Sequence, residues 1–289
     1  MTTHTIHERW LDGLHGPMRY WQSEPTHGLP VLFIHGFGAM IEHWRAVMRP
    51  VARQHRVLAL DLYNFGRSAI PQALPSRRLW SDQIAELIAD ASHGPAIIVG
   101  HSMGGMLAAQ VAHDYPQFVR GLVLVDSTGL NAPKNSPLPL DLEDIFRNVM
   151  QSPGVGEMLA NLLGNPIGAR QGLFSAYHRK DRVTPQLIEQ FSEPLRRQGG
   201  KDAYLAVSRT FPDLVLDFQK GEVQVPTLLI WGEHDASVPP SLAEYFKQTL
   251  LPQAEIAIIP ECGHCPFDEN PETFCDILLP WLDRLNADH

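Results

Sequence analysis

Short apolar runs rich in β-branched residues recur along the chain, and segments with helical spacing of apolar residues separate them. Runs of this kind predict buried strands at Val31–Ile34, Val57–Leu62, Ala96–Val99, Leu122–Asp126, Thr227–Gly232 and Glu255–Pro260. Helices are expected around His43–Arg53, Leu79–Ala91 and Met103–Ala112. Strands that alternate with helices indicate βαβ units and a mostly parallel sheet. We expect Ile6–Asp12 and Met18–Gln22 to add an antiparallel edge.

This alternation stops after Asp126 and resumes at Thr227. The intervening residues contain several prolines and no run typical of a buried strand. They predict a helical cap at residues 128–222, inserted into a core formed by residues 1–127 and 223–289. Inserted caps of this kind often carry the residues that determine substrate specificity. The helices expected in the cap are Leu142–Met150, Val155–Leu163, Pro185–Gln198 and Ala203–Thr210.

The most specific chemical signal is the sequence Gly-His-Ser-Met-Gly at residues 100–104, between a predicted strand and a predicted helix. This G-x-S-x-G pattern is typical of a nucleophile elbow, a tight turn that exposes a serine hydroxyl. Glycines are needed because side chains at positions 100 and 104 would collide with the neighbouring strand and helix. The pattern predicts Ser102 as a nucleophile. The alternative is that Ser102 only caps the helix.

A nucleophilic serine needs a base and an acid that orients the base, and both are expected downstream in the order acid, then histidine. Asp235 follows the strand at 227–232, and His264 follows the strand at 255–260. Both therefore lie at the carboxyl edge of the predicted sheet, where sites are built. We expect Ser102, Asp235 and His264 to form a catalytic triad. Asp126, at the end of an earlier strand, is the alternative acid.

A glycine-containing turn, His-Gly-Phe-Gly at residues 35–38, follows the strand at 31–34. Such a turn can aim a backbone N–H at a developing oxyanion. We expect the Phe37 and Met103 amides to form the oxyanion hole. His35 and His101 flank these turns, and we interpret both as scaffolding of the loops.

With these segments in place, the sequence resembles the α/β-hydrolase family over nearly the whole chain, from about Val31 to about Leu285. The resemblance implies an α/β fold with a mostly parallel central sheet, flanking helices and an inserted helical cap. The cap and the sequence Cys-Gly-His-Cys-Pro-Phe-Asp-Glu-Asn-Pro look most like an esterase-like branch that includes pheophytinase. The chain departs from the family pattern at Asn64, where glycine is usual, but asparagine tolerates the left-handed conformation. Asp61, in the same turn, is interpreted as structural.

Composition and charge limit the kinds of partner that the protein is expected to bind. A net charge of −9 argues against a nucleic-acid or anionic-membrane surface. No apolar run approaches the ~20 residues that cross a bilayer, and we expect a cytoplasmic protein with no integral membrane association.

Three cysteines cannot all pair, and Cys262, His264 and Cys265 lack the second ligand pair of a zinc site. We expect no metal and no cofactor.

The apolar cap favours a hydrophobic ester as the small-molecule substrate, cleaved by a carboxylesterase through an acyl-serine intermediate. Dehalogenases and epoxide hydrolases of the family use an aspartate nucleophile, which Ser102 excludes. One alternative is a carbon–carbon bond hydrolase that acts on a ring-cleavage dienoate. Those relatives usually have asparagine at position 101 and an aromatic residue at position 265. A second alternative is a ligand receptor with little turnover. Three arginines of the cap could hold the carboxylate of a dienoate: Arg170, Arg179 and Arg182. Three aromatic residues could line the substrate pocket: Trp80, Phe174 and Tyr177.

Overall fold

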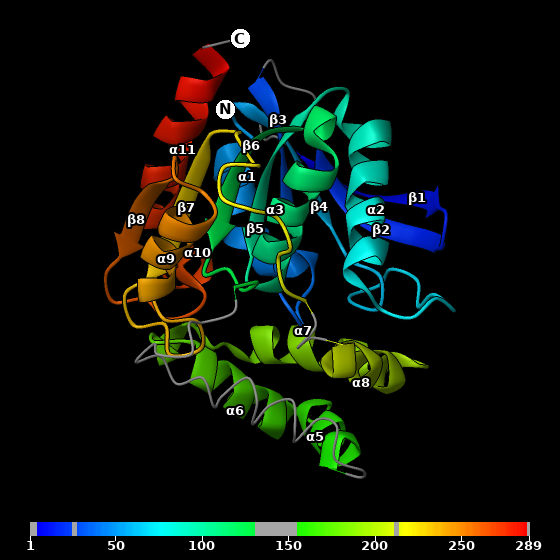
Figure 1. Cartoon of the computed structure of the whole chain (residues 1–289). Helices are drawn as coiled ribbons and strands as arrows, with labels where there is room; N and C mark the ends of the chain where they lie inside the picture. The colour runs from blue at the N-terminus through cyan, green and yellow to red at the C-terminus, as the bar shows by residue number, and fades with distance from the viewer. Residues whose placement is uncertain (1–4, 25–27, 131–154, 211–213, 288–289) are drawn as a thin grey trace.

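The computed structural model describes residues 5–24, 28–130, 155–210 and 214–287, and its centre is an eight-stranded sheet (Figure 1). The strand order is β1-β2-β4-β3-β5-β6-β7-β8. The first two strands form an antiparallel edge, and β3 to β8 run parallel to one another. This is the predicted α/β-hydrolase fold. The strands are β1 (Ile6–Gly13), β2 (Gly16–Ser23), β3 (Gly28–Ile34), β4 (His55–Leu60), β5 (Ala96–His101), β6 (Val119–Val125), β7 (Thr227–Gly232) and β8 (Glu255–Ile259).

Both faces of the parallel sheet are buried, which explains why its central strands are almost continuously apolar. Side chains alternate between the faces, as in β3, where Leu32 and Ile34 enter one apolar cluster and Val31 and Phe33 enter the other. The first cluster packs under α2 (Arg77–Leu87), α3 (Met103–Asp114) and α9 (Ser241–Thr249). The second packs under α1 (Arg45–Val51), α10 (Pro266–Glu269) and α11 (Pro271–Ala287).

The element boundaries differ from the sequence predictions mainly at helix ends. The helix expected around residues 43–53 is a 3-10 turn, η1 (Ile41–Trp44), followed by α1. A π-helical turn, Ile88–Ser92, extends α2, and a 3-10 turn, Pro116–Phe118, separates α3 from β6. No helix in the described ranges is long and apolar enough to span a bilayer.

In the described part of the segment between β6 and β7, four helices form a separate layer across one end of the sheet (Figure 1). They are α5 (Val155–Leu163), α6 (Pro166–Ala176), α7 (Pro185–Arg196) and α8 (Gly200–Thr210), with a 3-10 turn η4 (Lys180–Arg182), and we call them the cap. The helix expected at 142–150 lies outside the described residues. The bounds of the cap, residues 128–222, remain a prediction. The grouping of residues 1–127 and 223–289 into one core also remains a prediction.

The sequence analysis did not identify α6, although its start is well defined. Asn165 caps it by accepting a hydrogen bond from the Ile167 N–H at 3.0 Å, and Pro166 occupies the first turn. Two glycines inside the helix weaken its sequence signal. Gly168 is required by packing, because a Cβ there would lie 2.2 Å from the Leu162 carbonyl oxygen.

Candidate active site

Ser102 occupies a strained turn between β5 and α3. Its φ of 54° lies in the left-handed region, which a non-glycine residue seldom adopts. A Cβ on Gly100 would lie 2.2 Å from the Gly104 carbonyl oxygen, and a Cβ on Gly104 would lie 2.5 Å from the Ile34 carbonyl oxygen. The side chain of Ser102 makes no capping hydrogen bond to α3, so it does not act as the ordinary helix cap considered as the alternative.

Asp235 and His264 meet at the carboxyl ends of β7 and β8. The Asp235 Oδ2 atom lies 2.7 Å from His264 Nδ1, and the other carboxylate oxygen accepts the N–H groups of Ser237 and Val238 at 2.7 and 2.9 Å. Burial tends to raise the pKa of Asp235, but the charge and hydrogen bond of His264 outweigh it, so the pKa falls below its usual value. Asp235 contacts the Nδ1 atom of His264, so Nε2 takes no part in this bond, and His264 and Ser102 line one cavity.

Asp126, the alternative acid, occupies a different position in the same cluster. Its Oδ1 accepts the Gly232 N–H at 3.0 Å, whereas Asp235 makes the hydrogen bond to His264. One carboxylate oxygen of Asp126, one of Asp235 and one imidazole nitrogen of His264 all lie within 4.8 Å of one another. Burial, and then the charge of Asp235, raise the pKa of Asp126 well above its usual value. The surroundings shift the two pKa values in opposite directions, and the acid with the lowered pKa contacts the imidazole.

The Phe37 amide belongs to a peptide that His35 holds in place. The His35 Nδ1 lies 2.8 Å from the Gly36 carbonyl oxygen, and its Nε2 accepts the Leu62 N–H at 3.0 Å. The second bond requires an unprotonated Nε2, so Nδ1–H donates to Gly36. Burial lowers the pKa of His35, which keeps this neutral form. Because the Gly36 carbonyl and the Phe37 N–H share one peptide plane, His35 fixes the direction of that N–H.

Met103 supplies the second backbone amide near the serine. It is the first residue of α3, and the first N–H groups of a helix have no partner within the helix. The positive end of the helix dipole adds to the attraction for an anion. Phe37 lines the same cavity as Ser102. These positions suit the expected oxyanion hole.

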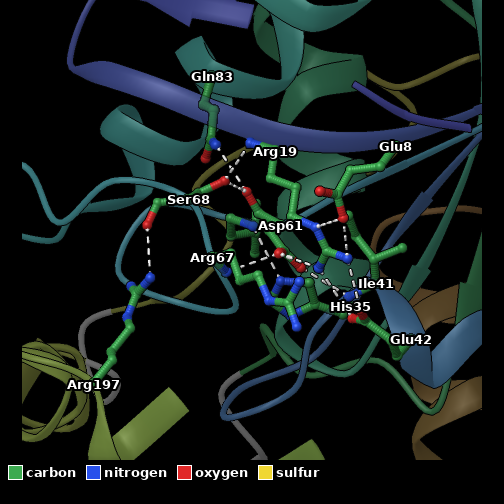
Figure 2. Close-up of polar contacts among 11 residues, drawn as sticks. Glu8, Arg19, His35, Ile41, Glu42, Asp61, Arg67, Ser68, Gln83 and Arg197 are labelled. Carbon is green, nitrogen blue, oxygen red and sulfur yellow. Dashed lines mark hydrogen bonds and ion pairs between the residues drawn. The ribbon is translucent and has the colours of Figure 1, made fainter. Parts of the chain in front are cut away.

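A buried polar network around Asp61 supports the turn that follows β3 (Figure 2). Asp61 Oδ1 accepts the Ile41 N–H at 2.9 Å, and Oδ2 accepts the Arg67 N–H at 2.9 Å and pairs with Arg19 at 3.0 Å. Arg19 pairs in turn with Glu42 at 2.7 Å. Asp61 is thus structural, as expected, and Asn64, in the turn that follows β4, has a φ of 74°.

Glu269 and His101 hold the loop that carries His264, and the sequence analysis gave Glu269 no role. Glu269 is fully buried, and its carboxylate accepts the N–H groups of Gly263 at 2.9 Å and Arg179 at 2.7 Å. His101 Nε2 lies 2.8 Å from the His264 carbonyl oxygen, so this ring is scaffolding, as interpreted. One feature of the sequence could have pointed to Glu269. It follows the proposed base, His264, by five positions and lies in the segment that resembles esterases.

His43, Tyr177 and Asp268 form a second buried chain beside the cavity, which sequence reasoning also missed. The Tyr177 hydroxyl donates to Asp268 Oδ2 at 2.7 Å and lies 2.9 Å from His43 Nε2, and Arg45 pairs with Asp268 at 2.8 Å. Burial, followed by the charge of Arg45, lowers the pKa of His43 well below its usual value. The neutral ring donates Nε2–H to Tyr177 and leaves Nδ1 without a hydrogen-bond partner among the described residues.

A cavity of about 220 Å³ joins Ser102 and His264 to the cap. Apolar cap side chains form much of its wall, and none of its described lining residues is an arginine or lysine. Tyr177 lines it, but Trp80 lies in the core, where its Nε1–H donates to the Tyr63 carbonyl, and Phe174 is not part of the wall. The cap contributes Leu163, Ala169, Gly172, Leu173, Ala176, Tyr177, Phe191, Leu195 and Tyr204.

The three cap arginines considered for a dienoate carboxylate make other contacts. The Arg170 guanidinium lies 4.3 Å from the Phe174 ring centroid, Arg179 donates to the Glu269 carbonyl at 3.0 Å, and Arg182 donates to the Asp268 carbonyl at 3.0 Å. None of the three lines the cavity.

The cysteines near His264 remain protonated thiols. Burial, followed by the charge of Glu269, raises the pKa of Cys262 to about 12 and that of Cys265 well above its usual value. Cys262 and Cys265 are buried and pack as small apolar side chains around the His264 loop.

Comparisons with known proteins agree with this geometry. The family described as the alpha/beta hydrolase fold matches residues 30–271. The chain is 31% identical over 270 residues to 2-hydroxy-6-oxo-6-(2'-aminophenyl)hexa-2,4-dienoic acid hydrolase of Metapseudomonas resinovorans, covering 90% of this chain and 86% of that one. It is 26% identical to Lipase 1 of Psychrobacter immobilis, covering 93% and 82%. A solved serine hydrolase involved in carbazole degradation superposes with a TM-score of 0.79 at 25% identity, covering 96% and 99%.

Proposed function

Because the chain belongs to the alpha/beta hydrolase fold family, we propose that it is a serine hydrolase, and specifically a carboxylesterase that cleaves hydrophobic esters. Ser102 is the nucleophile, His264 the base and Asp235 the acid that orients it. The Phe37 and Met103 amides are the oxyanion donors. The contact between Asp235 and His264 at 2.7 Å and the strained Ser102 turn support these roles.

The chemistry follows the geometry of the site. His264 Nε2 removes the Ser102 proton as Oγ attacks the ester carbonyl, and Asp235 stabilises the imidazolium that forms. The two amides stabilise the oxyanion of the tetrahedral intermediate. His264 then donates its proton to the leaving alcohol, which leaves an acyl group on Ser102. Water activated by the same histidine releases the acid and restores the serine.

The observation that carries the ester proposal is the character of the cavity. Its described wall is mostly apolar, and its described lining contains no arginine or lysine that could pair with a substrate carboxylate. A dienoate substrate brings such a carboxylate into the site, and burying it without a partner is costly. A neutral ester has no such requirement, and its acyl chain gains by burial against the cap.

Carbon–carbon bond hydrolysis is the second candidate, and the 31% identity to a dienoic acid hydrolase favours it. Two neutral imidazole nitrogens beside the cavity also suit this chemistry. His43 Nδ1 and His101 Nδ1 lack hydrogen-bond partners among the described residues, and both histidines line the cavity. Both nitrogens are buried, so they would accept hydrogen bonds from a hydroxylated substrate only after local movement, and the substrate carboxylate would still need a cation.

The two candidates predict opposite substrate preferences in one experiment. We expect kcat/KM for p-nitrophenyl acetate, butyrate and hexanoate to rise about fourfold per methylene that the cap encloses, because each buried methylene contributes ~0.8 kcal/mol. The same enzyme would be assayed on a 2-hydroxy-6-oxo-dienoate, with the folded Ser102→Ala variant as background. A dienoate kcat/KM at least about tenfold above that of the best ester would contradict the ester proposal.

A cytoplasmic location and a small, hydrophobic ester as partner, without nucleic acid or membrane, remain predictions. The ester series bears on the nature of the substrate. Localisation needs a separate measurement, such as fractionation of cells that produce the natural chain.

A further inference from the structure

Three exposed side chains from separate segments meet beside the loops that carry Asp235 and His264. His178 lies between α6 and η4, His234 follows β7, and Glu261 follows β8. One ligand atom from each residue lies within 4.8 Å of the other two. This cluster is distinct from Ser102 and the cavity, and the proposed hydrolysis makes no use of it.

The distances in the cluster suit a shared metal ion. His178 Nε2 lies 3.4 Å from Glu261 Oε2, and His234 Nε2 lies 3.8 Å from Glu261 Oε1. Two ligands of one tetrahedral Zn²⁺, each about 2.1 Å from the metal, are about 3.4 Å apart. Glu233 adds another carboxylate, 3.6 Å from His234 Nε2. Small side-chain rotations could therefore place two imidazoles and one or two carboxylates around one ion.

The backbone brings these side chains together before any ion binds. The His234 N–H donates to the Cys262 carbonyl at 2.8 Å, which joins the loops after β7 and β8. Gly263 lies so close to the cap that a Cβ there would be 2.6 Å from the His178 backbone nitrogen. The two imidazole rings are stacked with centroids 4.2 Å apart. Less conformational entropy is therefore lost when the ligands close on a metal.

The cluster is also accessible and chemically matched to a borderline cation. The exposed fractions of the side chains are 39% for His178, 42% for His234 and 78% for Glu261. Imidazole and carboxylate together are ligands that Zn²⁺ accepts, and exposed positions leave room for water in the remaining coordination site.

We propose that His178, His234 and Glu261 bind Zn²⁺, with Glu233 positioned to supply a fourth ligand. The ion would bridge the cap, through His178, to the two loops that carry Asp235 and His264. Its expected effect is to stabilise the folded protein, because a ligand that binds only the folded state raises the unfolding temperature. The site is structural and takes no part in the acyl-transfer steps.

Zn²⁺ titration of the untagged, metal-free protein tests the proposal, with calorimetry and thermal unfolding as readouts. We expect one saturable site and a rise in Tm. His178→Ala and His234→Ala should each weaken binding at least about tenfold, since even residues behind the ligands contribute about that much. His113→Ala is the matched control: His113 also contacts carboxylates, at 2.8 and 3.4 Å, but has no second histidine nearby in the described structure.

Co²⁺ provides a second readout, because its visible spectrum reports coordination directly. Tetrahedral-type absorption in the wild-type protein and in His113→Ala, lost in His178→Ala, would support the site. Equal Zn²⁺ affinity in all three variants would overturn it. That result would also be expected if the ion bound at Asp126, Asp235 and His264 instead. An unchanged Tm at saturating Zn²⁺ would overturn the bridging role.

Discussion

At the scale of single residues, Asp126 and Asp235 show how position alone gives two buried acids different roles. Both lie at the carboxyl ends of adjacent strands, β6 and β7. The contact with His264 lowers the pKa of Asp235, whereas burial and the nearby charge of Asp235 raise the pKa of Asp126. One acid can therefore orient the imidazole, and the other can only support the loop.

Replacing each acid by asparagine should separate these roles. Asp235→Asn should lower kcat for ester hydrolysis by about 10⁴, because the amide favours the wrong imidazole tautomer. Asp126 makes no hydrogen bond to His264, and Asp126→Asn keeps an acceptor for the Gly232 N–H, so we expect a loss of no more than about tenfold. Circular dichroism checks that both variants fold. The reverse ranking would assign the orienting role to Asp126.

The raised pKa of Asp126 also predicts a pH dependence of stability. Between the unfolded pKa of about 3.9 and its raised folded value, the folded state holds a proton that the unfolded state has lost. This group therefore stabilises the protein at low pH, and its contribution falls by up to about 1.4 kcal/mol per pH unit as pH rises. Relative to wild type, Asp126→Asn should gain stability from pH 4 to pH 8 in denaturant titrations. A constant difference would mean that Asp126 is ionised in the folded protein.

The sequence indicated the residues of the proposed triad but not the side chains that support them. Ser102, Asp235 and His264 each follow a recognisable strand in the expected order, and glycines mark the serine turn. Glu269 and His43 have no such signal, because their roles depend on which loop the buried side chain meets after folding. The contact of Glu269 with Arg179 joins residues 90 positions apart.

At the scale of elements, the strand β5, the Ser102 turn and the helix α3 form one unit with little spare space. Gly104 lets α3 start against the carbonyl oxygens at the end of β3. The turn that follows β3 also packs closely on the serine, since a Cβ on Gly36 would lie 3.1 Å from Ser102 Cβ. The close contact between backbones holds the serine in its strained conformation.

A methyl group at Gly104 should disrupt this unit. Its Cβ would lie 2.5 Å from two backbone carbonyl oxygens, which cannot turn aside as a flexible side chain could. We expect Gly104→Ala to lower the free energy of unfolding by about 3 kcal/mol and to abolish most activity. Gly94→Ala is the control, because no atom lies within 4 Å of its Cβ and its stability should be unchanged or slightly higher. Similar stability and activity in the two variants would contradict the packing argument.

Strands were predicted more fully than helices, and the reason is physical. A strand buried on both faces is apolar at nearly every position, so β5 and β7 are evident as uninterrupted runs. The cap helix α6 contains glycines selected for contact with α5 and has no clear apolar stripe in the sequence. Helix ends such as the π-helical turn after α2 depend on local hydrogen bonding that periodicity does not report.

At the scale of the whole molecule, the cap contributes the wall of the cavity and contacts the core on both sides of the site. Arg197, after α7, donates to the Ser68 carbonyl at 3.0 Å, next to the Asp61 network (Figure 2). On the other side, the His264 N–H donates to the Ala176 carbonyl at 2.9 Å. The cap therefore limits the size of the cavity, whereas the residues of the proposed triad, Ser102, Asp235 and His264, lie in loops at the carboxyl ends of the strands. The sequence indicated an apolar cap, but which of its residues line the cavity follows from three-dimensional packing.

In the proposed mechanism, Ser102 is an activated nucleophile served by His264 and Asp235. Fluorophosphonate labelling, followed by mass mapping of the modified peptide, tests it most directly. We predict rapid formation of a single adduct on Ser102, much slower labelling of Asp235→Asn, and no adduct in a folded Ser102→Ala variant whose esterase activity has fallen by several orders of magnitude. Absence of labelling in the wild-type protein is the result expected of a ligand receptor. That result, or an adduct on another residue, would contradict the account.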